Sequence, residues 1–246
     1  MKTKYFVKFL NKSAHLDADL ELVDVIKSAV KKNRLNSPGT KLLFDDADKT
    51  RHKKLSARRN SDHSRNIAAN HLAGTIREAF IKSMYEATTN YFQDILKAAT
   101  KKGLDTDRLI GEHLITFTSK ELIALGNFSK IVDRISSQIF RQLENEKNTK
   151  SLIIKMSKKL GLKIPENVID KALPYLEMRH LLVHSEGKAD KDFCKNYPTV
   201  HARDGKDLNL GYEMITQAKE TITMLIETFD NAIVAAGHIE KSEIQP

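Results

Sequence analysis

The sequence predicts an all-α protein, and three observations support that prediction. Only 10 glycines and 5 prolines occur among 246 residues, about half the usual share of roughly 12%, so turns are scarce. Apolar residues recur every three or four positions over long stretches, as on one face of a helix. No stretch alternates apolar and polar residues as a half-buried strand does. We therefore expect an antiparallel helical bundle with an extra N-terminal helical segment.

The first part of the chain predicts one amphipathic helix and a basic connection. Apolar residues spaced by three or four positions predict a helix over residues 15–34, which ends at Asn36-Ser37-Pro38-Gly39. These apolar residues are Leu16, Leu20, Val23, Ile26 and Val30. Residues 49–65 contain seven lysines or arginines and one acid. This stretch can bury little, and we expect a solvated linker or the start of the next helix.

The middle of the chain predicts the longest helix and then shorter ones. The apolar stripe of the long helix runs from Leu72 to Ala98. Residues 105–117 are expected to form a shorter helix. Thr118 and Glu121 have the spacing of a capping box, in which each side chain bonds the backbone N–H of the other residue, and so predict a helix start. The next long helix is marked by Ile131, Ile135, Ile139 and Leu143.

Two further helices are expected before residue 185. Residues 151–160 predict a short helix that stops at Gly161. Pro165 stands at the first position of the following helix, because proline is well tolerated there. That helix continues to His184, with a kink expected at Pro174.

The last part of the chain is expected to contain an irregular stretch and one more helix. Residues 187–210 have no helical period and are expected to be irregular or a small hairpin, whereas residues 215–237 predict a terminal helix.

Residues 1–60 carry 15 basic and 7 acidic side chains, but residues 61–246 carry 26 basic and 25 acidic side chains. We therefore expect a basic N-terminal helical segment and linker over residues 1–60, followed by a helical bundle domain over residues 61–246.

The basic segment predicts contact with a polyanion. Lysine and arginine gain affinity for nucleic acid by releasing the counterions held by its phosphates. The candidate nucleic-acid ligands are Arg51, Lys53, Lys54, Arg58, Arg59 and Arg65. The alternative is that these side chains form an ordinary solvated face.

Composition excludes several other classes of protein. The single cysteine, Cys194, rules out an intrachain disulfide and a paired-cysteine zinc site, so a cytoplasmic setting is expected. No apolar run approaches the roughly 18 residues of a membrane span, and no membrane partner is expected. The chain lacks the common phosphate-loop, dinucleotide, serine-hydrolase and zinc-protease motifs. No cofactor and no resident metal are therefore expected.

Charged and polar side chains interrupt one of the most apolar predicted helices. Glu177, Arg179, His180 and His184 stand among leucines that should be buried, and charges in such a place are costly unless they are paired or functional. Arg179 and His184 suit phosphodiester cleavage, since arginine binds phosphate and histidine moves protons near neutral pH.

Two other interpretations of these four residues stay open. Glu177, His180 and His184 lie on one helix face and could ligate zinc or iron, although a di-metal bundle needs a second such motif, which the chain lacks. In a purely structural interpretation, Arg179 bridges to Glu177 or to a neighbouring helix, and His184 caps carbonyl groups at the helix end.

The run Arg179-His180-Leu181-Leu182-Val183-His184 resembles the motif of the HEPN superfamily, whose helical domains include many metal-independent endoribonucleases. That motif is an arginine, usually followed by a polar residue, with a histidine a few positions later. The continuation through Gly187 to Asp190 is also similar to the family pattern. Three other pairs share the spacing, namely Arg58/His63, Arg65/His71 and Arg108/His113. Only Arg179 has two long amphipathic patterns before it and one after it, as the family fold implies.

The resemblance covers roughly residues 65–237 and implies a homodimer in which two copies of the motif form one RNA-cleaving site. His184 would act as general acid or base, and Arg179 would bind the scissile phosphate. His180 would orient or polarise these groups. The RNA 2′-hydroxyl would be the attacking group, and no metal would be needed. Residues that would complete the site are sought among Glu86, Thr89, Asn90, Asp94, Glu177 and Asp190.

Two main hypotheses of function follow. The first is an intracellular endoribonuclease of the HEPN type, a toxin or defence effector, with a cognate antitoxin or regulatory protein as a further partner. The second is a non-catalytic helical module that binds nucleic acid or a partner protein, using the same bundle and the basic N-terminal segment. A metal-dependent hydrolase is a third.

Overall fold

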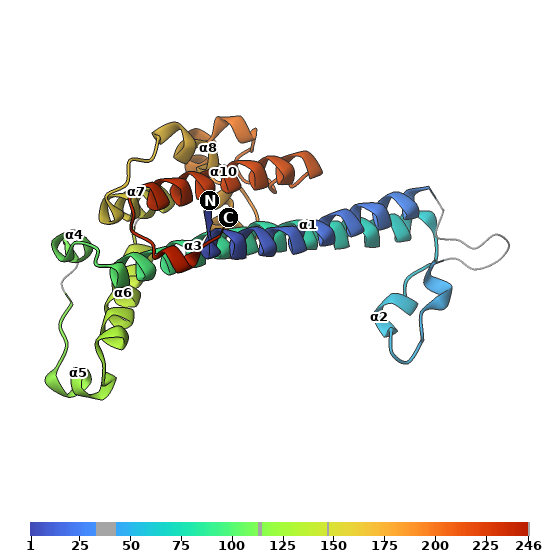
Figure 1. Cartoon of the computed structure of the whole chain (residues 1–246). Helices are drawn as coiled ribbons and strands as arrows, with labels where there is room; N and C mark the ends of the chain where they lie inside the picture. The colour runs from blue at the N-terminus through green and yellow to red at the C-terminus, as the bar shows by residue number, and fades with distance from the viewer. Residues whose placement is uncertain (33–42, 113–114, 147, 246) are drawn as a thin grey trace. The chain divides into compact units, whose positions relative to one another are not determined.

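The computed structural model describes residues 1–32, 43–112, 115–146 and 148–245, and it confirms the all-α prediction (Figure 1). The helices of the described residues are α1 (Lys4–Lys31), α2 (Lys53–Ser56), α3 (Asp62–Lys102), α4 (Thr106–Ile110), α5 (Ser119–Leu125), α6 (Phe128–Glu144), α7 (Thr149–Leu160), α8 (Glu166–His184), α9 (Lys191–Asn196) and α10 (Tyr212–Ala235). Short 3-10 helices are η1 (Leu43–Asp46), η2 (Pro198–Val200) and η3 (Lys241–Glu243). Strands β1 (Lys2–Thr3) and β2 (Ile244–Gln245) pair antiparallel, with Thr3 opposite Ile244.

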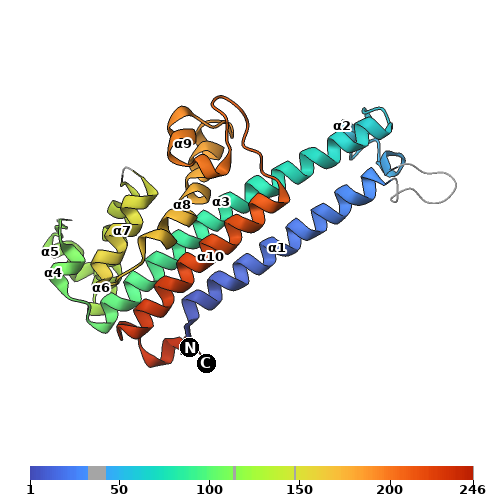
Figure 2. The same ribbon diagram turned by 90° about the horizontal axis from the view of Figure 1, so that it is seen from above.

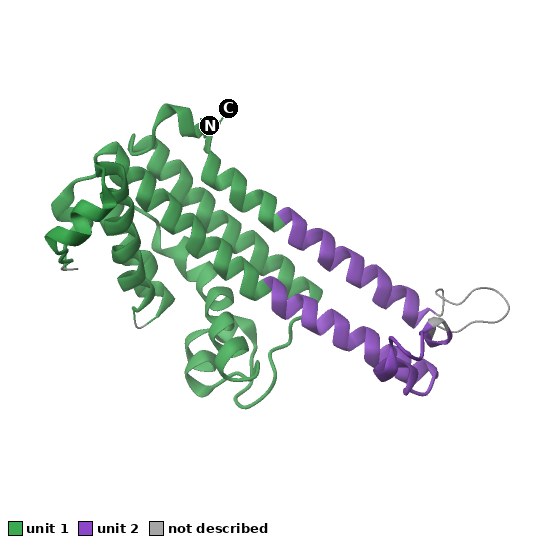
Figure 3. Cartoon of the chain, turned by 90° about the horizontal axis from the view of Figure 1, so that it is seen from below, with its two compact units in different colours: residues 1–13, 81–246 green, residues 14–80 purple. Residues whose placement is uncertain are grey.

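The described chain divides into two compact units (Figure 3). One contains residues 1–13 and 81–246, and the other contains residues 14–80. The division between these units falls within α1 and within α3. The physical reason is that the first residues of the chain bond to the last long helix, as described below, and so belong to the larger unit.

The smaller unit, residues 14–80, contains parts of α1 and α3 with the η1–α2 connection. Its buried apolar side chains on the two long helices are Leu20, Val23, Val30, Ala69, Ala73 and Phe80. Arg77 on α3 lies 3.7 Å from Asp24 on α1. The helix predicted over residues 15–34 begins earlier, at Lys4, and its predicted end at Asn36–Gly39 lies outside the described residues.

The connection between α1 and α3 contains an ordered turn. The Asp48 carboxylate accepts hydrogen bonds from the Thr50 hydroxyl (2.6 Å) and from the backbone N–H groups of Thr50 (2.7 Å) and Arg51 (2.8 Å). These bonds lower the pKa of Asp48 to about 2. The turn leads into the four-residue helix α2, so part of the basic stretch is helical and not only a linker.

The larger unit is built around α3, α8 and α10. Figure 2 shows α10 beside α3, and the Phe92 and Phe229 rings of these helices meet edge to face with their centroids 4.8 Å apart. Helix α8 packs against α10 and α7, and α7 also packs against α4 and α6. Such helices bury one apolar face each, which is why their spacing of three and four is visible in the sequence.

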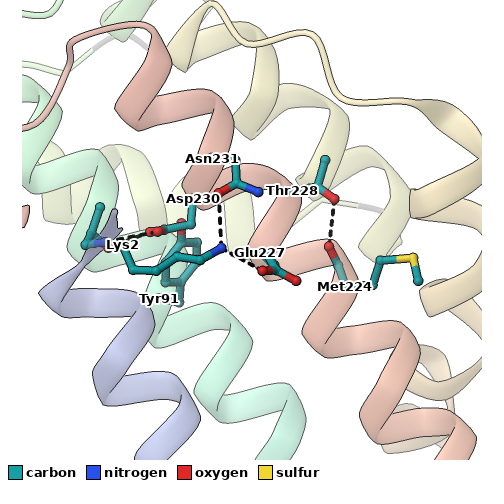
Figure 4. A network of polar contacts seen from close by, with 8 residues as sticks. Lys2, Tyr91, Met224, Glu227, Thr228, Asp230 and Asn231 are labelled. Carbon is teal, nitrogen blue, oxygen red and sulfur yellow. Dashed lines mark hydrogen bonds and ion pairs between the residues drawn. The ribbon is translucent and has the colours of Figure 1, made fainter. Parts of the chain in front are cut away.

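A buried carboxylate joins the chain's first residues to α10 (Figure 4). Asp230 is fully buried, and it accepts hydrogen bonds from the Thr3 backbone N–H (3.0 Å), the Thr3 hydroxyl and the Tyr91 hydroxyl (3.0 Å). Lys2 reaches Glu227 (2.6 Å) and Asn231 (3.0 Å) on the surface of the same helix. Three donors satisfy a charge that would otherwise be costly to bury.

Several helix ends confirm or correct the sequence predictions. The Thr118–Glu121 capping box is present, and Gly161 ends α7 with a left-handed φ of 65°. The helix predicted over residues 105–117 is wrong in extent, because α4 stops at Gly111, which has a φ of 51°. Pro165 precedes α8 as its N-cap and does not occupy its first position. Residues 187–210, expected to be irregular or a hairpin, contain α9 and η2.

Candidate active site

The C-terminal half of α8 carries the Arg179–His184 motif. Met178, Leu181 and Leu182 are buried there, which holds this face of α8 in the core. Arg179 is half-buried, and His180 and His184 are exposed. The helix therefore presents the three motif side chains at the edge of the core, where a ligand can reach them.

The Arg179 guanidinium is held against an aromatic ring of α3. Its central carbon lies 5.1 Å from the centroid of the Tyr85 ring, a cation–π geometry. It borders a cavity of about 140 Å³ whose lining includes Glu144, Glu177 and His180. Among the described residues, the Arg179 guanidinium has no ion-pair partner within 4 Å. The guanidinium N–H groups remain available to an anion.

Glu177 does not pair with Arg179. Its Oε1 atom accepts a hydrogen bond from the backbone N–H of Thr149 (2.9 Å). That N–H belongs to the first turn of α7, where a backbone donor has no partner within the helix. Glu177 therefore ties α8 to the start of α7 and forms one wall of the Arg179 cavity, which disfavours the structural interpretation of an Arg179–Glu177 pair.

The two histidines of the motif are neighbours on the surface. The centroids of the His180 and His184 rings are 4.7 Å apart, and the rings are inclined by 45°. His184 is the last residue of α8, and the backbone N–H groups of Ser185 and Gly187 bond the Leu181 carbonyl at this end. The carbonyl is thus satisfied by the backbone, without a cap from His184.

Burial changes the acidity of two side chains beside Arg179. It raises the pKa of Glu144, with Arg141 and Arg179 acting in the opposite direction. Burial also raises the pKa of Tyr85, again opposed by Arg179. Tyr85 thus keeps its proton at neutral pH, and the cavity combines a fixed cation with a carboxyl group whose pKa is raised.

The acid or polar residue sought on the long helix does not face Arg179. Glu86 pairs with Lys12 of α1 (3.2 Å), and Asp94 pairs with Lys8 of α1 (2.8 Å). Asn90 lines a different cavity, which is bordered by α1 residues, and Thr89 is buried with its hydroxyl bonded to the Glu86 carbonyl. The turns of α3 that carry these residues therefore direct them away from the motif.

Tyr85 and Glu144 are the residues that sequence reasoning missed. Tyr85 lies one position beyond Met84 of the apolar stripe, and this offset turns its ring toward α8. Glu144 ends α6, and nothing in its sequence neighbourhood connects it with a motif 35 positions later. Only the packing of α6, α7 and α8 brings these side chains together.

Asp190 lies near the motif but has a local task. Its carboxylate accepts the backbone N–H of Phe193 (2.7 Å) and so caps α9. It also lines a second cavity of about 690 Å³, which lies between α8, the start of α7 and the α9–η2 segment. The aspartate expected after the motif is therefore close to the site without contacting Arg179.

The basic candidates lie in the smaller unit, and most of them are accessible. Arg51, Lys53, Lys54, Arg58 and Arg59 are exposed. Arg65 differs from these candidates, because it is only 3% exposed. Its guanidinium donates hydrogen bonds to the Asn60 side chain (2.8 Å) and to Asp62. Arg65 therefore stabilises the start of α3 and does not offer its charge to a nucleic acid.

The other arginine–histidine pairs have no comparable setting. Arg58 and His63 are both exposed, and the buried Arg65 is engaged as described. Arg108 is exposed beside α7, whereas His113 lies outside the described residues. Within the described part of the chain, no three histidine, cysteine or acidic side chains are arranged to hold a metal ion. Glu177, His180 and His184 therefore do not form the three-ligand set considered from the sequence.

Comparisons with known proteins leave the site to be judged on its geometry. No protein family, no curated protein and no solved structure matches the chain. None of the described helices combines the length and the apolar character needed to cross a membrane. The fold and the site together define an all-α protein with an arginine and a histidine, Arg179 and His180, at a surface cavity and a second histidine, His184, beside His180.

Proposed function

We propose that the protein is a metal-independent endoribonuclease of the HEPN type. The observation that carries the proposal is the half-buried Arg179, stacked on Tyr85 with its N–H groups unengaged, next to the neighbouring rings of His180 and His184. An arginine can bind a phosphate through two parallel hydrogen bonds and neutralise the charge that develops on it. A histidine can accept or donate a proton near neutral pH.

In the proposed reaction, RNA supplies its own nucleophile. A neutral His184 removes the proton of a 2′-hydroxyl group, and the 2′-oxygen attacks the adjacent phosphorus while Arg179 holds the non-bridging oxygens. The bond from phosphorus to the 5′-oxygen breaks, and a protonated histidine gives that oxygen its proton. The products are a 2′,3′-cyclic phosphate and a 5′-hydroxyl. His180, whose ring contacts that of His184, orients it.

A second copy of the chain would supply the second histidine. His180 and His184 are exposed, and Val183 between them is 48% exposed. An exposed apolar side chain between two exposed histidines gives a partner copy a packing surface. A symmetric contact at this surface would bring the partner's own motif close. The proposed enzyme is therefore a homodimer with a composite site, and a cognate antitoxin would act by covering it.

RNA cleavage in the presence of a chelator tests this proposal. Wild type should produce 2′,3′-cyclic phosphate ends. Arg179→Ala should lower kcat by about 10²–10³-fold because it removes transition-state charge stabilisation, and His184→Ala by about 10²–10⁴-fold. His15→Ala, an exposed histidine on α1, is the matched control and should cleave normally. Equal cleavage by His184→Ala and wild type, or complete dependence on a divalent ion, would overturn the proposal.

A second candidate function rests on the exposed basic residues of the smaller unit. Arg51, Lys53, Lys54, Arg58 and Arg59 could bind the phosphates of a nucleic acid without any cleavage. In that case RNA binding should weaken steeply with salt and survive Arg179→Ala. It should be lost when the five residues are replaced by glutamine. The endoribonuclease proposal predicts the opposite pattern for cleavage, which depends on Arg179.

A further inference from the structure

The cavity of about 690 Å³ beside the motif adjoins the Arg179 cavity. Asn148, Glu177 and His180 line both. Its volume falls within the range of roughly 300–1,000 Å³ that is usual for ligand pockets. A ligand whose phosphate is held by Arg179 can therefore extend past His180 into this larger space.

The floor of the larger cavity is apolar, and one wall is aromatic. Leu173, Pro174, Leu181 and Phe193 are buried beneath it. Tyr197 also lines it, and its ring packs on Phe193 with the centroids 5.2 Å apart. A half-buried aromatic ring above an apolar floor offers a stacking surface to a planar base.

Carboxylates outnumber lysine and arginine side chains in the lining of this cavity. Asp170, Glu177, Asp190 and Asp192 contribute carboxylates, against one lysine, Lys150. Lys150 is already bonded to Asp170 (2.8 Å) and Glu166 (2.9 Å). Asp192 has no hydrogen-bond or ion-pair partner among the described residues. The carboxylates favour a ligand edge that carries N–H donors.

We propose that this cavity binds the base of a nucleotide adjoining the cleaved phosphate and that it favours guanine. The inference rests on the proposed function. Guanine presents the N1–H and N2–H₂ donors side by side, which matches the two oxygens of one carboxylate, and Asp192 is available for this pairing. The Asn148 side-chain oxygen accepts the Ser151 N–H (2.8 Å), so its amide N–H₂ remains free to donate to the O6 or N7 acceptors of guanine.

The two cavities share one polar wall and differ in their other side chains. Arg179 lines only the smaller cavity, which would take the phosphate. Asp192 and Tyr197 line only the larger one, which would take the base, whereas Glu177 and His180 line both. Adenine and uracil lack the adjacent pair of donors, so they satisfy only one oxygen of a carboxylate. Asp192 and Tyr197 are therefore specificity-determining residues, and neither is needed for proton transfer.

The first experiment measures binding without cleavage. Dinucleotides with 2′-deoxyribose cannot cleave, so their dissociation constants report recognition alone. Those that contain guanine should bind wild type about 5- to 100-fold more tightly than those without it, and Asp192→Asn and Tyr197→Ala should lose that preference. Asp204→Asn and Tyr212→Ala, exposed residues outside the cavity, are the matched controls and should keep it. Circular dichroism confirms that each variant is folded.

The second experiment maps cleavage sites in RNA of random sequence. Wild type should cut next to guanine, and Asp192→Asn should cut with relaxed preference. If wild type cleaves RNA but Asp192→Asn and Tyr197→Ala keep its base preference, the inference is wrong and the endoribonuclease proposal stands. If wild type prefers guanine dinucleotides but cleaves no RNA, the endoribonuclease proposal is wrong, and the inference that the cavity binds guanine stands. Guanosine 5′-monophosphate binding as tightly as a dinucleotide would overturn RNA as the occupant in favour of a free nucleotide.

Discussion

Glu144 shows how the surroundings of one residue set its chemistry. Burial raises the pKa of its carboxyl group, and the nearby Arg141 and Arg179 offset only part of this effect. The folded protein therefore holds the Glu144 proton more tightly than the unfolded chain does. Its contribution to stability is complete below the ordinary glutamate pKa and is lost as the pH rises through the higher folded-state pKa.

Glu144→Gln should accordingly make the protein more stable at pH 7 than wild type. Glutamine cannot ionise, so it avoids the cost of ionising a carboxyl group whose pKa is raised in the folded protein. The difference in the free energy of unfolding should shrink as the pH falls toward 4, where wild-type Glu144 is protonated. Urea denaturation at the two pH values measures it. Glu220→Gln, an exposed residue of α10, should show no such change, and a variant less stable than wild type at pH 7 would contradict the argument.

At the scale of single elements, two glycines illustrate how helix position decides what a residue contributes. Gly161 ends α7 with φ at 65°, a left-handed conformation that favours glycine, and a Cβ atom there would meet the Arg108 guanidinium. Gly74 lies inside α3, and a Cβ atom there would meet no other atom within 4 Å. The same residue type therefore stabilises one helix end and weakens the middle of another helix.

Gly161→Ala and Gly74→Ala should shift stability in opposite directions. Alanine at Gly161 must adopt a left-handed conformation, which costs about 1–2 kcal/mol. Alanine at Gly74 should add about 0.5–1 kcal/mol, because it reduces the entropy lost when the helix forms. Thermal unfolding followed by circular dichroism compares the two. Stabilisation by Gly161→Ala would show that the helix end is not held as described.

At the scale of the whole molecule, Asp230 explains why residues far apart in the sequence form one unit. Its carboxylate bonds Thr3 at the start of the chain and Tyr91 on α3. Burial, together with the Asp230 charge, raises the pKa of Tyr91 well above its ordinary value, so the hydroxyl stays a donor at neutral pH. The larger unit thus includes residues 1–13 although residues 14–80 form a separate unit.

Tyr91→Phe should lower the free energy of unfolding by about 1.5–3 kcal/mol, the usual loss for a hydrogen bond to a charged group. Tyr175→Phe is the matched control, because its hydroxyl bonds Gln217 at an exposed position (3.2 Å), and it should change stability by less than about 0.5 kcal/mol. Chemical denaturation of the two variants gives the comparison. Equal effects would mean that the buried carboxylate does not need its tyrosine donor.

Helices α3, α6 and α10 could be predicted from the sequence because each buries one apolar stripe, and the period of that stripe depends only on helix geometry. The start of α5 and the end of α7 were also predictable, since capping boxes and left-handed glycines act within a few residues. The helix over residues 105–117 was overextended because an apolar period does not show that Gly111 breaks it.

The candidate site also contains some residues that the sequence predicts and others that only the tertiary structure brings together. Arg179, His180 and His184 could be named from the sequence because they interrupt an apolar face within one helix, a local pattern. Tyr85 and Glu144 could not, since they reach Arg179 only through the packing of α3 and α6 around α8. The sequence by itself determined the helices and the motif, which depend on short-range geometry. Tertiary structure decided the motif's neighbours and the burial of Arg65, because long-range packing determines which faces meet.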